Sequence, residues 1–421
     1  MGTGNIVGEI PKHEHAGNAA LVKTKIIKSQ VVKKAKGNDS KPATIVSKVL
    51  RGISSPVTAL LPKPISLVRT VHRVRVKENP QLSNPLSRGE LELPNQFKCT
   101  HNGESFLLHD SGGSKRRFLV FTTLKNLNFL SKCDQWLSDG TFKSVPSIFM
   151  QLYTIHGFMN GKSVPLVYLL SPDKTKSTYI KFLKVLRQSL PNFSPKRIVV
   201  DFEEAFIEAF KEIYSGVKIS GCSFHFNQCI WRHIQLCGLQ KLYNTDITFA
   251  YNIRLLMALP FLPTDDVICG YELIVGSDYY DRYNDELNTL LEYFEITWIG
   301  KSRHNRRKRD KPRFNIKMWN CYKAVCNDYI RSNNLMEGWH NGFNRRVAVC
   351  HASIGQFLNA IKDEQCKTEM LIAQIDSGLN VSISRRKTYR DYDNRLKSIV
   401  MNYNSDYKLE YLKNIAKVLS I

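Results

Sequence analysis

Short apolar runs dominate the stretch from residue 117 to residue 225, and their composition is that of β-strands. β-Branched and aromatic residues fill these runs, which predicts strands at 117–123, 135–142, 149–157, 164–170, 197–201 and 217–225. Asn160 and Gly161 separate the third run from the fourth, and this pair is typical of a tight hairpin. The pair Asp139-Gly140 likewise predicts a turn at the end of the second strand.

Between these runs, apolar residues recur every three or four positions, as on one face of an α-helix. The pattern is clearest at 179–190 and 203–214, and it predicts further helices at 124–130 and after Asn227. The order of elements predicts an α/β fold with a mixed sheet flanked by helices, antiparallel at its start and parallel at its end. From 234 to 330 only helical periodicity remains, which predicts a helical insertion, and a last helical segment follows at 337–376.

Composition and periodicity together divide the chain into five segments. They are a basic N-terminal arm (1–98), the first part of the α/β core (99–233), the helical insertion (234–330), the C-terminal part of the core (331–376) and a basic C-terminal tail (377–421). The arm lacks Trp and Tyr and contains short amphipathic pieces such as 43–50. One interpretation is a flexible, poorly ordered arm that only partly folds. The other is a partly helical arm that becomes ordered on DNA.

The formal net charge of +24 is concentrated in three segments, with net +11 at 1–98, +7 at 301–313 and +5 at 385–421. Basic clusters gain affinity for nucleic acids by releasing counterions from the phosphate backbone, so we expect DNA as the partner. The expected contacts are Arg73, Arg75, Arg303, Arg306, Arg307, Lys308 and Arg309. The segment 303–310 also resembles a nuclear localisation signal, with a solvated loop as the alternative. We expect no membrane partner, because no apolar run approaches the roughly 20 residues that span a bilayer.

Ten cysteines are spread over the chain from Cys99 to Cys366, and no two of them have a Cys-x-x-Cys spacing. Their density is far below that of a disulfide-stabilised scaffold. We therefore expect an intracellular protein in a reducing compartment, with most of its cysteines present as buried thiols.

Three acidic residues have the sequence context of an active site. Asp139 and Asp201 each end an apolar run, and ligand sites of α/β sheets gather at the carboxyl ends of strands. Glu337 falls in the first turn of a predicted helix. Three carboxylates within about 4–6 Å of one another repel unless cations bind between them, and oxygen ligands suit Mg²⁺ or Mn²⁺. Taken singly, each Asp is also a common turn former or helix cap, so a structural role is the alternative.

Six segments in order resemble the transposase domain of Mutator-like elements, over about residues 115–360. They are WLSDGTFKSVPSIFMQLYTIHG (136–157), SVPLVYLL (163–170), RIVVDFEEAF (197–206), GCSFHF (221–226), YFEITWIG (293–300) and RSNNLMEGWHN (331–341). The resemblance implies a ribonuclease-H-like fold interrupted by a helical insertion. It also implies an Asp-Asp-Glu triad at Asp139, Asp201 and Glu337 that holds two divalent cations, Mg²⁺ or Mn²⁺.

The activity that this resemblance implies is DNA transposition in the nucleus. The triad would cut the DNA strand at a transposon end, and the freed 3′ hydroxyl would then attack target DNA. A homo-oligomer is compatible with this reaction. The alternative function is a domesticated or decayed descendant that binds DNA without cutting it.

The resemblance also implies a role for Cys222 and His225, because the family carries a Cys-x-x-His pair between the second Asp and the Glu. With Cys229 and His233, these residues offer four ligands of the type that zinc prefers. The alternatives are a structural or site-supporting role for the pair, or a helix face packed in the core. His340 lies three residues after Glu337 on the same predicted helix face, where it could position a phosphate or water, or serve as a structural histidine.

The N-terminal segment resembles the linker after a FLYWCH-type zinc finger, with His13 and His15 as the histidine end of that finger. No cysteine precedes these histidines, so residues 1–98 cannot form the complete finger. Either the sequence is truncated or mispredicted at its N-terminus, or the element has decayed or been repurposed.

Overall fold

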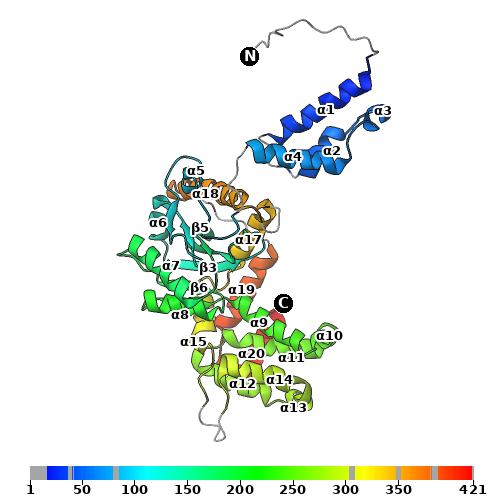
Figure 1. The fold of residues 1–421 in the computed structure, drawn as a ribbon. Coiled ribbons are helices and arrows are strands. Elements are labelled where there is room, and N and C mark those ends of the chain that lie inside the picture. Colours follow the sequence, from blue (N-terminus) through cyan, green and yellow to red (C-terminus); the bar gives the residue numbers. More distant parts are fainter. Residues whose placement is uncertain are drawn as a thin grey trace. The chain divides into compact units, whose positions relative to one another are not determined.

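A computed structural model of the chain describes residues 17–36, 40, 42–78, 85–302, 309–347, 352–379, 381 and 387–419 (Figure 1). The chain divides into two compact units, Met1–Ser83 and Asn84–Ile421. The histidines of the predicted finger remnant, His13 and His15, lie outside the described residues, as do Arg303, Arg306, Arg307 and Lys308.

The N-terminal unit is helical. It contains α1 (Ala19–Ala35), α2 (Pro42–Leu50), α3 (Ser55–Thr58) and α4 (Pro64–Glu78). The Asn18 side chain begins α1 by accepting hydrogen bonds from the first backbone N–H groups of the helix. Apolar residues at helical spacing on α1, α2 and α4 form a small core that includes Ile27, Val31, Val46 and Val71. Of the two interpretations given for the arm, the helices of this unit agree with the partly helical one, and its ordering on DNA stays a prediction.

The second unit is built on a seven-stranded mixed sheet. Its strands are β1 (Leu107–Asp110), β2 (Leu119–Phe121), β3 (Gln135–Thr141), β4 (Gln151–Met159), β5 (Lys162–Ser171), β6 (Arg197–Val200) and β7 (Lys218–Gly221). The order across the sheet is β1-β2-β5-β4-β3-β6-β7. All neighbours pair antiparallel except β3 with β6 and β6 with β7, which pair parallel. The predicted antiparallel start and parallel end of the sheet are confirmed.

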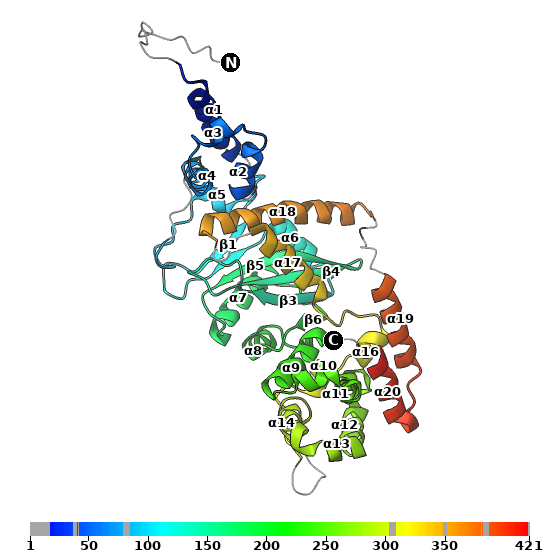
Figure 2. The ribbon, with the colours of Figure 1, turned by 90° about the vertical axis from the view of Figure 1, so that its right-hand side faces the viewer.

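Helices cover both faces of this sheet (Figure 2). One face carries α7 (Lys176–Ser189) and α8 (Glu204–Ile213), which pack against each other. The other face carries α6 (Leu124–Leu130), α17 (Asn334–Val347) and the long α18 (Ile354–Asp376). The short α5 (Asn95–Lys98) packs against α18, so the end of the predicted arm belongs to the second unit. The sheet residues between these layers are almost fully buried.

A helical segment follows β7, as predicted. It comprises α9 (Ser223–Leu236), α10 (Gln240–Thr245), α11 (Ile247–Ala258), η1 (Leu259–Phe261), η2 (Thr264–Asp266), α12 (Val267–Val275), α13 (Asp278–Arg282), α14 (Asn284–Phe294), η3 (Glu295–Ile299), α15 (Ile316–Trp319) and α16 (Tyr322–Cys326). The C-terminal residues add α19 (Lys387–Met401), η4 (Ser405–Tyr407) and α20 (Lys408–Val418). Leu412 and Ile415 of α20 are buried where this helix packs on α11 and α12. The C-terminal residues 387–418 are therefore part of the second unit rather than a separate tail.

Local details differ from the sequence-based expectations. Asp139 and Gly140 lie inside β3 and pair with Thr154 and Tyr153, because the ladder with β4 overrides the turn preference of Asp-Gly. The strand predicted at 217–225 ends at Gly221, since α9 begins at Ser223. The helix predicted at 337–376 is two helices, α17 and α18. No helix in the described parts of the chain is long and apolar enough to cross a membrane.

Candidate active site

The parallel pairing of β3 with β6 determines where the first two candidate acids lie. Gln135 is in register with Arg197, and the last pair of this ladder is Leu137 with Val199. Asp139 and Asp201 each lie two residues beyond that pair, so the register brings them to the same end of the two strands. This is the carboxyl end of both strands, where α/β sheets form ligand sites.

Asp139 is buried, with 7% of its surface exposed. Its Oδ1 atom accepts a hydrogen bond of 2.8 Å from the backbone N–H of Gly140. Burial and the neighbouring Asp201 and Glu337 carboxylates raise the pKa of Asp139 to about 8. At neutral pH, and without a bound divalent cation, this side chain is therefore mostly a protonated acid.

Asp201 belongs to a polar network that the sequence did not single out. Burial, followed by the charge of Glu203, raises the pKa of Asp201 to about 6. Glu203 in turn accepts hydrogen bonds from Lys174 Nζ at 2.9 Å and from the Tyr179 hydroxyl at 2.5 Å. The charge of Lys174 offsets a small part of the rise in the pKa values of Asp139 and Asp201. The ammonium group of Lys174 itself is paired with Glu203.

Glu337 reaches the site because the start of α17 is anchored to the sheet. Met336 is buried against Leu137, Val199 and Cys222. The side-chain amide of Asn333 donates a 3.0 Å hydrogen bond to the Ser138 carbonyl oxygen, on the residue before Asp139. Burial raises the pKa of Glu337 above its ordinary value. Asn333 gave no signal in the sequence beyond its place in the segment 331–341.

Two histidines lie next to the acids. His225 Nε2 is 3.7 Å from Glu337 Oε1, and His340 Nδ1 is 3.7 Å from Asp139 Oδ2. Burial, with smaller contributions from the Arg232 charge and from His225 respectively, lowers the pKa values of His225 and His340 to about 4. Both imidazoles are therefore neutral at pH 7, and these contacts are too long for strong hydrogen bonds. The ring nitrogens of His225 and His340 that face the acids can therefore still bind a water or phosphate.

The donor chemistry of the three acids suits a hard divalent cation. Burial raises the pKa values of Asp139 and Asp201, so their ionised forms are disfavoured in the folded protein. A bound divalent cation would favour those ionised forms. In the described part of the chain, however, no group of three or more His, Cys, Asp or Glu side chains is spaced to hold a metal ion. The acids influence one another electrostatically, but their oxygen atoms do not converge on one point.

Cys222, just before α9, and the Cys and His residues of α9 do not form a zinc-type ligand set among the residues that the structure describes. Cys222 is buried, its Sγ accepts a 3.1 Å hydrogen bond from the Asn333 backbone N–H, and burial raises its pKa to about 12. His233 stacks on the Tyr293 ring, with 3.3 Å between ring centroids. Cys222 therefore connects the start of α9 to the start of α17 as a neutral thiol.

The described basic residues among the expected DNA contacts have different surroundings. Arg73 on α4 is exposed, whereas Arg75 is half-buried and donates a 2.6 Å hydrogen bond to the Ser40 carbonyl oxygen. Arg309 forms ion pairs with Glu295 at 2.9 Å and Glu272 at 3.1 Å. The guanidinium of Arg309 is thus committed to contacts within the helical segment rather than presented to solvent.

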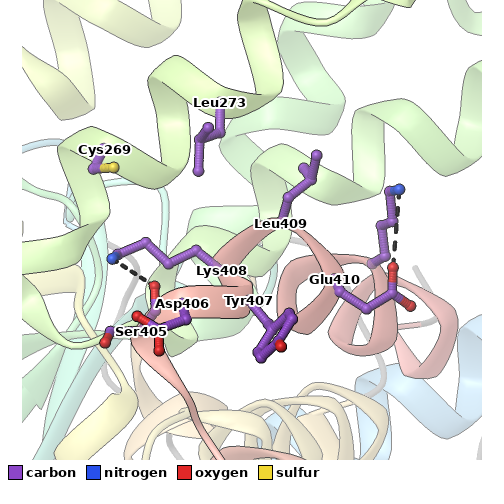
Figure 3. A pocket seen from close by; sticks show the side chains of 9 residues that line it. Cys269, Leu273, Ser405, Asp406, Tyr407, Lys408, Leu409 and Glu410 are labelled. Atoms are coloured by element: carbon purple, nitrogen blue, oxygen red, sulfur yellow. Dashed lines mark hydrogen bonds and ion pairs between the residues drawn. The ribbon is translucent and has the colours of Figure 1, made fainter.

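One pocket of the second unit has no connection to these acids. It has a volume of about 380 Å³ and lies between α12 and the η4–α20 segment (Figure 3). Its lysines are already paired, Lys408 with Asp266 at 3.2 Å and Lys413 with Glu410 at 3.9 Å. We therefore do not consider it a candidate site.

Fold and site together define an α/β protein with acids at the carboxyl ends of parallel strands. The family model for the MULE transposase domain matches residues 135–229, from the first residue of β3 into α9. The matched segment includes Asp139, Asp201, Cys222 and His225, and Glu337 lies beyond it. This similarity indicates transposase descent for the matched part of the chain. Among curated proteins, none matches the chain. The resemblance of the N-terminal segment to a FLYWCH-type linker stays a prediction.

Proposed function

We propose that the chain is a DNA transposase of Mutator-like descent, in which Asp139, Asp201 and Glu337 carry out metal-dependent strand cleavage and strand transfer. The observation that carries the proposal is the placement of Asp139 and Asp201 at the carboxyl ends of β3 and β6, with Glu337 near enough to raise the pKa of Asp139. A sheet that is antiparallel from β5 to β3 and parallel from β3 to β7 supports a ribonuclease-H-like core.

Two divalent cations, Mg²⁺ or Mn²⁺, are the proposed cofactors, with the three carboxylates as their ligands. When bound, such ions neutralise phosphate charge and promote ionisation of the attacking water or 3′ hydroxyl. The protein orients Asp139 through the Gly140 N–H and Glu337 through the buried start of α17. Lys174 contributes positive charge beside Asp139 and Asp201, where a DNA phosphate would approach.

The N-terminal unit is the part that we propose to grip DNA. Lysines on α1 and Arg73 on α4 are exposed, and residues 1–98 carry a net charge of +11. Such a surface binds the DNA backbone without reading its sequence. Residues 301–313, with a net charge of +7, are a second basic segment that we propose to contact DNA. A nuclear location is also part of this proposal.

The proposal is tested by strand cleavage with the purified full chain and a duplex that carries the ends of its own element. We expect nicks in Mg²⁺ but not in EDTA. Asp139→Ala and Glu337→Ala should reduce cleavage to background while DNA binding is retained. Asp134→Ala is the matched control, because Asp134 is an exposed carboxylate paired with Lys196 just before β3. Cleavage that survives both site substitutions would contradict the assignment.

A non-catalytic DNA-binding protein of transposase descent is the second candidate. It is favoured by the fact that, among the residues described here, no three acidic, His or Cys side chains are spaced to hold a metal ion. In this case the basic surfaces would be retained while the acids no longer bind cations. The same assay separates the two candidates, since this one predicts DNA binding with no cleavage in either Mg²⁺ or Mn²⁺.

A further inference from the structure

Two exposed phenylalanines accompany the candidate acids. The chain has 21 phenylalanines, all within the described residues, and the exposed ones are Phe142 and Phe224, with 44% and 37% of their surface accessible. Single exposed apolar side chains are common on protein surfaces and need no explanation. Here, however, both exposed phenylalanines belong to segments that carry or contact the same group of acids.

Phe142 directly follows β3, three residues after Asp139. The ammonium group of Lys174 lies 4.4 Å from the centre of the Phe142 ring, and it pairs with Glu203 at 2.9 Å. The backbone N–H of Glu203 donates a 3.3 Å hydrogen bond to Asp201 Oδ1. A short series of contacts therefore connects the Phe142 ring to Asp201.

Phe224 is the second residue of α9 and is connected to the third acid. The centre of its ring lies 5.7 Å from the centre of the His225 ring. His225 Nε2 in turn lies 3.7 Å from Glu337 Oε1. Exposed aromatic rings thus adjoin the acids at two places, one near Asp201 and one near Glu337.

Both rings start from backbone that is held in place. After Phe142 the chain returns to the interior, where Ser144 is buried and its hydroxyl donates a 2.6 Å hydrogen bond to Asn344 Oδ1 on α17. Just before Phe224, the first backbone N–H of α9 donates a 2.9 Å hydrogen bond to the Arg331 carbonyl oxygen. An aromatic ring on fixed backbone offers a large contact surface and loses little conformational entropy when a ligand binds.

Cations accompany both rings. Lys143, next to Phe142, is exposed, and the half-buried Lys174 lies over the Phe142 ring. Arg232 on α9 is exposed, and its charge contributes to the lowered pKa of His225. Surfaces that bind single-stranded nucleic acids combine these two groups, because the cations attract the phosphates while the rings stack on the bases. The surroundings of the two phenylalanines therefore suit a nucleic-acid strand better than a neutral apolar partner.

We propose that Phe142 and Phe224 stack on unpaired bases of the DNA strand whose backbone reaches the acids, so that the preferred substrate has unpaired nucleotides beside the reacting phosphate. In an intact duplex the neighbouring bases cover both faces of each base, and a protein ring can stack only where bases have left the duplex stack. This inference rests on the proposed DNA partner. It concerns which form of DNA binds, and it does not depend on whether the acids cut that DNA.

The test compares the affinity of the purified full chain for two DNAs of equal length, measured by fluorescence anisotropy. One DNA is a continuous duplex, and the other has a short central bubble of unpaired nucleotides. EDTA prevents metal-dependent cleavage, and pH 6 keeps Asp139 protonated, so that no cation is needed to offset its charge. We expect the wild type to prefer the bubble. Phe142→Ala and Phe224→Ala should each lower the ratio of the two affinities by about fivefold or more, the contribution of one stacked base.

Conservative substitutions separate base stacking from a structural role of the ring. Phe142→Trp should keep the preference for the bubble, whereas Phe142→Leu should lower it as Phe142→Ala does, because leucine offers apolar surface without a flat ring. Tyr407→Ala is the matched control and should leave the ratio unchanged. Tyr407 is an exposed aromatic residue on η4 that lines the pocket in Figure 3, which has no connection to the acids.

Equal affinities of the wild type for the two DNAs would overturn this inference, as would an unchanged preference in the double variant with Phe142→Ala and Phe224→Ala. The proposed DNA-binding function itself would survive either result. Failure to bind both DNAs would overturn that function together with the inference. If the double variant loses self-association but keeps the DNA preference, the two rings belong to a contact between copies of the chain, and the inference is wrong.

Discussion

Replacing Asp139 by Asn should stabilise the chain when no divalent cation is present. Asp139 is buried among other acids, so its ionised form is disfavoured in the folded protein. An amide has nearly the same shape, carries no charge and can keep the hydrogen bond from the Gly140 N–H. Removing one of several neighbouring negative charges also relieves the repulsion between the remaining carboxylates.

The size of this effect follows from the pKa of Asp139, which rises from 3.8 to about 8 on folding. Between these values the folded state binds more protons at Asp139 than the unfolded state, so stability is lost as the pH rises. Linkage gives a loss of about 1.4 kcal/mol per pH unit, or about 4 kcal/mol at pH 7. Burial of the amide offsets part of this gain, and we expect Asp139→Asn to be about 2–4 kcal/mol more stable at pH 7.

The assay is urea unfolding of the second unit in EDTA from pH 4 to pH 9, with Asp134→Asn as the control. The stability difference between Asp139→Asn and the wild type should be near zero at pH 4, grow with pH and level off above pH 8. Excess Mg²⁺ should reduce the difference by stabilising the wild type alone. A difference that does not change with pH, or a destabilised variant at pH 7, would refute this electrostatic reasoning.

Three further substitutions test other parts of the account. Met336→Ala should cost about 2–5 kcal/mol in urea unfolding, because it leaves a cavity under the start of α17, and it should also slow cleavage. Asn333→Ala removes a buried hydrogen bond to the β3 backbone and should cost about 1–3 kcal/mol in the same measurement. Replacing Lys23, Lys25 and Lys28 of α1 by Gln should flatten the salt dependence of DNA affinity by up to about 2.7 in log–log slope, with little change in melting temperature. An unchanged slope would exclude α1 from the DNA interface.

The strands that carry the candidate acids could be predicted because their signals are local. The apolar runs before Asp139 and Asp201 indicated two strands, and the helical pattern between them indicated a crossover connection, which favours parallel pairing. The sequence could not show that Asp139 and Gly140 lie inside a strand. Their turn preference is overridden by pairing with β4, which is a tertiary effect.

Other parts of the site had no sequence signal because they depend on residues far apart in the chain. Lys174 and Glu203 form an ion pair beside Asp201, although nothing in their local sequence suggested that they would meet. Asn333 connects α17 to β3 across almost 200 residues. The many lysines of the N-terminal segment left two interpretations open, a poorly ordered arm and a partly helical one, although apolar residues recur at helical spacing.

The central claim is that Asp139, Asp201 and Glu337 together bind divalent cations. The most direct measurement is the number of Mn²⁺ ions bound per chain, from the electron paramagnetic resonance signal of free Mn²⁺ during titration of the full chain with its DNA end present. The account predicts two bound ions in the wild type, and loss of at least one in each of Asp139→Ala, Asp201→Ala and Glu337→Ala. No bound Mn²⁺ in the wild type, or the same binding in all three variants, would contradict it.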